Sequence, residues 1–268
     1  MTDPQPEAPP PHSDWRHLLD TWREDILVSV AALTRVPVKL GFEITPALRA
    51  RALRAHPIVG LGIGAVGAVA YAIATAFGLP PLPAGLLAIG AVVALTGAVH
   101  EKGLADVSDA FSGGRTLERK LEILRDDRVG GSAVIALVLS VMLRAGAIAA
   151  LADPGLVALA LLAAGAVSRG FLPAVLRMLQ PVGGGDIHTG TPTAETTVIA
   201  AALGAAASLI CLGLAPGAAA YVASAGAVIV MAAIAFRQIG GYTDDVLGAC
   251  QQVGEIVLLL AAAAHAGS

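Results

Sequence analysis

The chain has 268 residues, of which 56% are hydrophobic and 14% are charged, and its formal net charge is −3. Soluble domains carry about 25% charged residues, so this composition excludes a soluble globular domain, a disordered chain and a nucleic-acid-binding protein. The 31 glycines and the two cysteines, Cys211 and Cys250 in apolar segments, are typical of close-packed membrane helices with buried thiols and exclude a disulfide-stapled domain.

The first 34 residues predict a tail and a surface helix. Residues 1–13 are polar and rich in proline, which predicts a disordered tail. Residues 14–34 place apolar side chains at helical spacing, and we interpret them as an amphipathic helix lying in the membrane interface. A helix packed on the cytoplasmic face of the protein is the alternative. The apolar positions are Trp15, Leu18, Leu19, Trp22, Ile26 and Leu27.

Seven apolar segments follow, and each approaches the ~20 residues that a helix needs to cross a bilayer. Pro80-Pro81, Asp153-Pro154-Gly155 and Pro216-Gly217 separate three pairs of them. We therefore expect an all-α integral membrane protein of about seven transmembrane helices, with residues 14–268 forming one polytopic domain. The segments are 56–78, 83–99, 132–151, 155–173, 195–213, 216–236 and 247–264.

Charge alternates between the connections. The loops 100–131, 174–194 and 237–246 carry lysine or arginine, whereas the loops between them carry none. The positive-inside rule places the charged loops and the N-terminus in the cytoplasm, and the C-terminus outside. Nearly all ionisable side chains would then gather on the cytoplasmic side.

The first charged loop carries a cluster of carboxylates. Asp106 and Asp109 share one helical face, and Glu101 precedes them. A turn at Gly113-Gly114 predicts a helical hairpin that brings Asp126 back towards them. Clustered carboxylates suit Mg²⁺, and Mg²⁺ suits diphosphate chemistry. For any single aspartate, a solvated surface charge is the alternative.

Several polar side chains interrupt the later apolar segments. Gln251 and Glu255 share a helical face beside Gln252, while Arg144 and Arg169 lie in or next to other segments. Such groups mark either a functional cavity or hydrogen bonds between helices. We expect Arg144 to line a polar cavity or to pair with a carboxylate such as Glu255.

Two glycine-rich stretches have different interpretations. The loop 181–193 is flexible enough to close on a phosphate. Gly62, Gly64 and Gly67 formally match a dinucleotide fingerprint, but they lie inside an apolar segment where no βαβ unit is expected. Close packing between helices is the better interpretation.

The motifs resemble a known family, the cobalamin synthases, in order over most of residues 30–260. The resemblance rests on LTRVPV (33–38), HPIVG (56–60), TGAVHEKGLADVSDAFSGG (96–114), RKLEILRDDRVG (119–130), SR (168–169) and GGYTDDVLGACQQVGE (240–255).

The resemblance implies a multi-pass enzyme of the bacterial inner membrane that uses Mg²⁺ on the cytoplasmic side. It would join adenosylcobinamide-GDP to α-ribazole or α-ribazole 5′-phosphate and release GMP. The implied metal ligands are Asp106, Asp109 and Asp126, with Glu101 as a further ligand or base, and His100 would orient a ligand or the nucleophile. The implied substrate-binding residues are Arg35, Arg128, Arg169, Thr243, Gln251, Gln252 and Glu255.

The sequence departs from the family pattern at Lys102, where an acidic residue is usual, and at Asp127 and Asp244. These departures keep an impaired enzyme or an inactive membrane scaffold of corrinoid assembly open. A CDP-alcohol-type phosphotransferase and a transporter are further alternatives. The bilayer is an expected partner, nucleic acid is not, and a homo-oligomer stays open.

Overall fold

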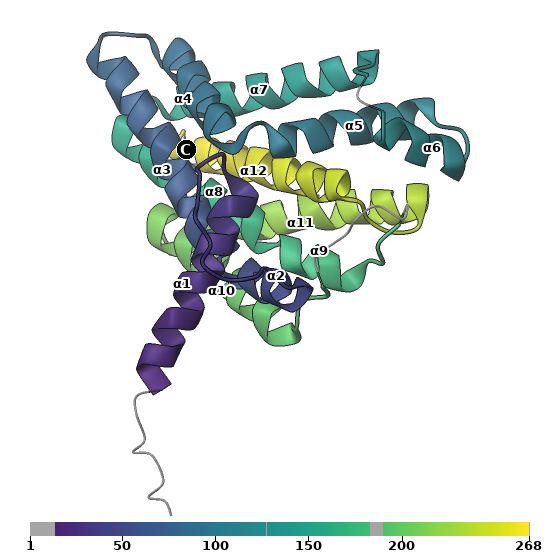
Figure 1. Cartoon of the computed structure of the whole chain (residues 1–268). Helices are drawn as coiled ribbons and strands as arrows, with labels where there is room; N and C mark the ends of the chain where they lie inside the picture. Colours follow the sequence, from purple (N-terminus) through teal and green to yellow (C-terminus); the bar gives the residue numbers. More distant parts are fainter. Residues whose placement is uncertain (1–13, 127, 183–189, 268) are drawn as a thin grey trace, which may run out of the picture.

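A computed structural model of the chain describes residues 14–126, 128–182 and 190–267, and the regular elements within these ranges are all helices (Figure 1). The predicted tail over 1–13 lies outside the described residues. The α-helices are α1 (Asp14–Leu33), α2 (Pro46–Ala52), α3 (His56–Ala76), α4 (Pro81–Thr96), α5 (Val99–Gly113), α6 (Leu117–Leu124), α7 (Gly131–Leu151), α8 (Pro154–Gly170), α9 (Leu172–Met178), α10 (Ala194–Leu212), α11 (Leu214–Ile239) and α12 (Asp244–Ala266), and a short 3₁₀ turn η1 (Leu53–Ala55) joins α2 to α3.

Six of the seven expected membrane segments are present as helices, whereas the expected segment 83–99 corresponds to α4, which is long enough to span a membrane only together with α5. Six helical stretches in the described chain are long and apolar enough to span a membrane, and the bent pair α4–α5 makes up to seven. The first stretch starts before the expected segment 56–78, because helix begins at Pro46. Thr45 caps this helix by accepting a hydrogen bond from the Leu48 amide at 3.2 Å, and proline is favoured in a first helical turn.

Small residues set the packing at the centre of the bundle, where α8 has most of its span buried. Gly60 and Gly64 of α3 lie directly against the backbone of α8 at Gly165 and Leu161, so that a Cβ on either glycine would collide with a carbonyl oxygen. Gly62 faces open space. The glycine motif is therefore a helix-packing surface, as predicted, and not a nucleotide-binding loop.

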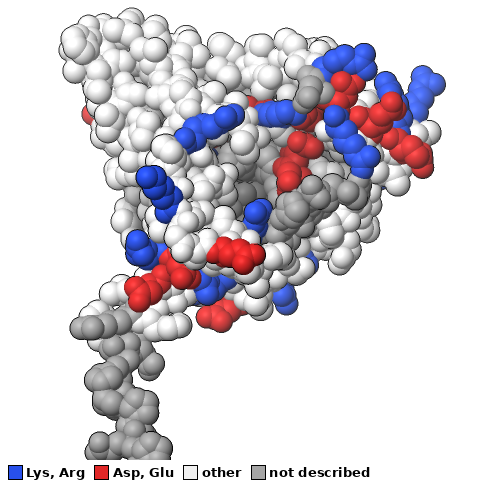
Figure 2. Space-filling view, viewed as in Figure 1, with Lys and Arg blue, Asp and Glu red and all other residues white. Residues whose placement is uncertain are grey.

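The charged connections meet at one end of the bundle. The Lys120 ammonium contacts the Gln238 carbonyl at 3.2 Å, and the Tyr242 amide donates to the Gln180 carbonyl at 2.9 Å. The Gly190 amide donates to the Pro46 carbonyl at 3.2 Å. Figure 2 shows acidic and basic side chains around a hollow on this face. The three connections that carry lysine or arginine therefore lie close together, as the predicted clustering of charge requires.

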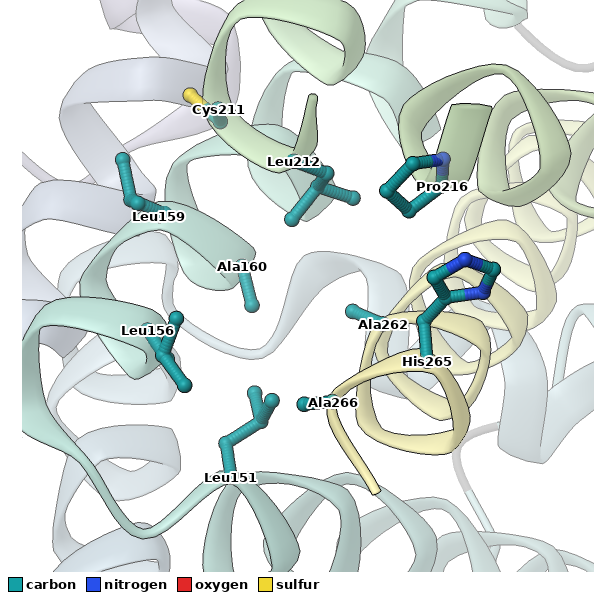
Figure 3. Close-up of a pocket in the computed structure, with 10 residues that line it drawn as sticks. All are labelled: Leu151, Leu156, Leu159, Ala160, Cys211, Leu212, Pro216, Ala262, His265 and Ala266. Carbon is teal, nitrogen blue, oxygen red and sulfur yellow. The ribbon is translucent and has the colours of Figure 1, made fainter. Parts of the chain in front are cut away.

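The opposite end of the bundle is apolar. A pocket of about 170 Å³ lies there among the ends of α7, α8, α10, α11 and α12 (Figure 3). Apart from His265, its lining consists of side chains such as Leu151, Leu156, Leu212 and Pro216. Because no Asp, Glu, Lys or Arg side chain lines it, this pocket is poorly suited to binding a phosphate.

The N-terminal helix α1 packs differently from the predicted stripe. Its second half is held by Asp25 and Ser29, both fully buried, and the Ser29 hydroxyl donates to the Ala52 carbonyl at 2.9 Å. The first half projects from the bundle (Figure 1) and leaves Trp15 and Leu18 exposed. The helix thus combines both predicted alternatives: one half packs on the protein and the other presents an apolar surface.

Candidate functional site

A sharp break between α4 and α5 builds the site. Gly97 and Ala98 both have positive φ angles, 69° and 59°, and the two helices meet at 94°. The bend turns the first turn of α5 into the bundle, so that His100 and Glu101 are buried. A backbone that departs from regular helix at the depth of the membrane is tolerated where other parts of the protein cover it.

Glu101 meets a buried arginine. The Arg144 guanidinium of α7 lies 3.1 Å from Glu101 and 3.2 Å from Glu255 of α12. Arg169 of α8 lies 3.5 Å from the second oxygen of Glu255. Two cations and two carboxylates thus balance in the interior, which is the arrangement that makes buried charges tolerable. The predicted pairing of Arg144 with Glu255 is confirmed.

Amides and hydroxyls complete this network. The Gln252 amide nitrogen donates to Glu101 at 3.2 Å and to the Gln251 carbonyl at 2.9 Å, and the Gln252 oxygen accepts from Ser140 at 2.9 Å. Gln251 donates to Ser168 at 3.0 Å and to Glu255. These contacts join four helices, which agrees with the alternative of hydrogen bonds between helices. Substrate binding by Arg169, Gln251, Gln252 and Glu255 stays a prediction.

Asp106 takes part in a separate group. The Lys102 ammonium lies 2.7 Å from Asp106 one turn along α5. Asp245 of α12 interacts electrostatically with both residues. Two glycines allow this approach, because a Cβ on Gly103 would lie 2.6 Å from the Asp245 carbonyl oxygen and 3.1 Å from the Cα of Gly248.

Asp109 accepts hydrogen bonds from the start of α7. Its two carboxylate oxygens accept hydrogen bonds from the amides of Gly130 at 2.6 Å and Ala133 at 2.9 Å. Free amides at a helix N-terminus carry partial positive charge, which a carboxylate stabilises. Asp109 therefore caps a helix that follows it in the chain.

Asp126 pairs with Arg128 in an exposed loop. The guanidinium donates three hydrogen bonds to the carboxylate, at 3.1, 2.8 and 2.6 Å. These hydrogen bonds lower the pKa of Asp126 below its usual range. The predicted hairpin is present, with Thr116 capping α6 through the Arg119 amide at 3.3 Å.

The four predicted metal ligands therefore have four different partners, and the expected convergence of Asp106, Asp109 and Asp126 is not seen. Within the described ranges no group of three His, Cys, Asp or Glu side chains is placed to hold a metal ion. Asp106 and Asp245 remain as a pair. Mg²⁺ commonly uses only one or two carboxylates together with substrate phosphates, so this pair fits the ion. Sequence reasoning missed Asp245, although its motif was noted.

Three further predicted residues lie at or near the N-terminal ends of the helices that carry this pair. Arg35 is exposed and its guanidinium lies against Gly97 at the helix break. The Thr243 hydroxyl caps α12 by accepting from the Val246 amide at 3.4 Å. His100 is buried beneath Gly248, whose added Cβ would lie 3.1 Å from the His100 carbonyl oxygen. Residues 183–189 of the glycine-rich loop lie outside the described residues.

Comparisons with known proteins agree on one family. The family model described as cobalamin-5-phosphate synthase matches residues 25–263. An adenosylcobinamide-GDP ribazoletransferase from Bradyrhizobium diazoefficiens is 42% identical over 242 residues, covering 90% of this chain and 93% of the relative. Proteins of the same name from Mesorhizobium japonicum and Brucella ovis are 39% and 38% identical over 249 residues, and cover 92% and 88% of this chain and 94% and 95% of their own lengths. No solved structure matches the chain.

Proposed function

The chain belongs to the cobalamin-5-phosphate synthase family, and from this premise we propose that it is an adenosylcobinamide-GDP ribazoletransferase whose reaction takes place at the charged end of the bundle. The substrates are adenosylcobinamide-GDP and α-ribazole or its 5′-phosphate, and the products are a cobalamin or its phosphate and GMP.

One observation carries the location of the site. Gly103 of α5 and Gly248 of α12 pack backbone to backbone, and this contact brings Asp106, Lys102 and Asp245 together. Carboxylates can hold a Mg²⁺ ion that binds a diphosphate, and they can accept a proton. The pocket of Figure 3, at the opposite end of the bundle, has a mostly apolar lining.

The chemistry is a phosphoryl transfer. A ribazole hydroxyl oxygen forms a bond to the phosphorus attached to the cobinamide, and the bond from that phosphorus to the bridging oxygen breaks. GMP leaves with the electron pair on its phosphate. Asp245 is half-buried next to Asp106, and accepts the proton that the hydroxyl loses. The Lys102 ammonium pairs with Asp106 and reduces the negative charge that this carboxylate offers to a cation.

Mg²⁺ would be held by Asp106 and Asp245 together with the substrate's diphosphate. When bound, the ion neutralises charge on the transferring group and on the leaving group. Glu101, by contrast, is buried between Arg144 and Gln252. Through these contacts Glu101 holds α5 in place.

The chain is a multi-pass membrane protein. We place it in the bacterial inner membrane with the charged end facing the cytoplasm, because Lys and Arg gather in the connections at that end. Water-soluble substrates such as a ribazole then reach the hollow without crossing the bilayer.

Purified full-length protein in nanodiscs tests the function directly. We expect Mg²⁺-dependent release of GMP and formation of a corrinoid product when adenosylcobinamide-GDP and the ribazole acceptor are supplied together. Asp106→Asn is the matched control that keeps side-chain size and removes the charge. Tight binding of adenosylcobinamide-GDP without any GMP release would favour the inactive scaffold. Turnover of a CDP-alcohol substrate instead would favour the other phosphotransferase class.

A further inference from the structure

A large apolar groove lies on the side of the bundle, on helices that do not carry the Asp106 group. It has a volume of about 520 Å³ and runs between α11 and the segment made of α9 and the residue that precedes it. Aliphatic, aromatic and methionine side chains form its lining. Three alanines of α11, Ala225, Ala232 and Ala233, are among them, and such small side chains let a neighbour approach a helix closely. The groove therefore suits an apolar ligand.

The groove extends along the bundle to its charged end. At one end the rings of Phe171 and Tyr221 pack with their centroids 4.9 Å apart. At the other end both helices run into the charged connections, and Met178 and Phe236 there are 77% and 60% exposed. From Tyr221 to Phe236 the helix rises by ~22 Å at ~1.5 Å per residue, more than the ~15 Å of one leaflet of a bilayer. The groove is thus long enough to hold an acyl chain through a whole leaflet.

Two arginines mark the charged end of the groove. Arg177 lies three residues after Ala174, and Arg237 lies four residues after Ala233, so both continue the helical faces that line the groove. Both arginines are exposed. Arg177 donates to the Pro192 carbonyl at 3.3 Å, and Arg237 forms no ion pair within the described part of the chain. Neither α9 nor α11 contains an aspartate or a glutamate, so these two cations are not compensated by their own helices.

This combination of an acyl-chain groove and two cations matches an anionic phospholipid. Phosphate oxygens accept charge-assisted hydrogen bonds from guanidinium groups, and basic residues between membrane helices at the interface attract anionic headgroups. A zwitterionic lipid brings a cation of its own and gains less. A second copy of the chain that docked through the same face would bring the arginines of both copies together without any carboxylate between them, and like charges repel.

We propose that this groove is a binding site for an anionic phospholipid, whose acyl chain lies between α9 and α11 and whose phosphate accepts hydrogen bonds from Arg177 and Arg237. The inference does not depend on the proposed function, because neither arginine belongs to the Asp106 group. It goes beyond general contact with the bilayer, since it assigns one lipid position and a preference for negative charge.

Lipid titration of the delipidated full chain in detergent tests the headgroup contact. Native mass spectrometry resolves the first bound lipid, and the probes are phosphatidylglycerol and phosphatidylcholine with the same acyl chains. We expect wild type to bind the first phosphatidylglycerol at least tenfold more tightly, and Arg237→Gln to lower this preference by about fivefold. Arg115→Gln removes the same charge from an exposed position on the α5–α6 connection, away from the groove, and should leave the preference within about twofold of wild type.

A second pair of variants tests the acyl-chain groove. Ala233 is exposed and lines the groove, so Ala233→Phe places a ring in it and should weaken the first binding event of both lipids at least fivefold. Ala223 is also exposed on α11 but does not line the groove, and Ala223→Phe should bind both lipids as wild type does. Thermal unfolding checks that each variant is folded.

Equal affinities of wild type for the two lipids would overturn the inference, as would equal losses of preference in Arg237→Gln and Arg115→Gln. The mass spectra also report the oligomeric state. A dimer that phosphatidylglycerol leaves intact and that Ala233→Phe dissociates would assign the groove to a second copy of the chain, and would equally overturn the lipid site.

Discussion

Arg144 lies 3.1 Å from Glu101, although the two residues are 43 positions apart and sit on different helices. The contact fastens the first turn of α5 to the middle of α7 directly after the helix break. Glu255 completes it from α12. Because each of these charges is buried, none of them is tolerated without the others. The network therefore holds in place the helix that carries Asp106 and Asp109.

Arg144→Met tests this role. The substitution leaves Glu101 and Glu255 buried with less compensating charge, and breaking a buried ion pair costs about 3–5 kcal/mol. We expect a large fall in the unfolding temperature in detergent. Arg119→Met is the matched control, because Arg119 forms an exposed pair with Glu122 at 2.6 Å, and such pairs contribute about 0–1 kcal/mol. Equal effects of the two substitutions would contradict a structural network.

Gly97→Ala tests the helix break. Gly97 has φ of 69°, and an added Cβ would collide with the Arg35 guanidinium. We expect a loss of about 1 kcal/mol or more in stability, together with reduced turnover, because the first turn of α5 shifts. Gly90→Ala on α4, where a Cβ meets nothing within 4 Å, is the control and should be neutral or slightly stabilising.

Lys102→Asp tests the ammonium beside Asp106. At an effective dielectric of about 20, two unit charges ~4 Å apart interact by about 4 kcal/mol, so removing the cation should strengthen Mg²⁺ binding at least tenfold in a calorimetric titration and raise GMP release. Arg119→Asp makes the same change of charge on α6 and should have little effect. Slower turnover without tighter metal binding in Lys102→Asp would instead make Lys102 a phosphate contact.

Asp106→Asn and Asp109→Asn distinguish a role in the reaction, expected for Asp106, from a role in capping α7, expected for Asp109. We expect Asp106→Asn to lower turnover by about a hundredfold or more while the protein stays folded. Asp109 accepts from two amides of the α7 N-terminus, so Asp109→Asn should cost about 1 kcal/mol of stability. Turnover and thermal unfolding are measured on both. If the Asp109→Asn variant were fully stable but inactive, Asp109 would be a candidate metal ligand and not a helix cap.

Cysteine labelling tests the orientation in the membrane. In a Cys211→Ala/Cys250→Ala background, Ser112→Cys at the end of α5 should react only with reagent on the cytoplasmic side. Phe77→Cys, at the 82% exposed Phe77 next to the end of α3, should react only from the outside. Labelling of Ser112→Cys from outside alone would reverse the orientation.

The sequence by itself determined the places of six membrane helices, the charge of the connections between them, and the family. Apolar run length and charge along the chain are local quantities, so they can be read without knowing any contact. The cap of α6 at Thr116 and the packing role of Gly60 and Gly64 were predictable for the same reason, since each depends on residue type and near neighbours.

Only the tertiary structure decided which carboxylate meets which partner. The 94° bend at Gly97 and Ala98 turns α5 into the bundle, so Glu101 reaches Arg144 while Asp109 reaches the N-terminus of α7. Spacing along one helix gives no sign of such a bend, because the residues on either side continue a helical pattern. The approach of Asp245 to Asp106 likewise depends on two helices packing at glycines 145 positions apart, Gly103 and Gly248, a contact between distant segments that no local pattern encodes.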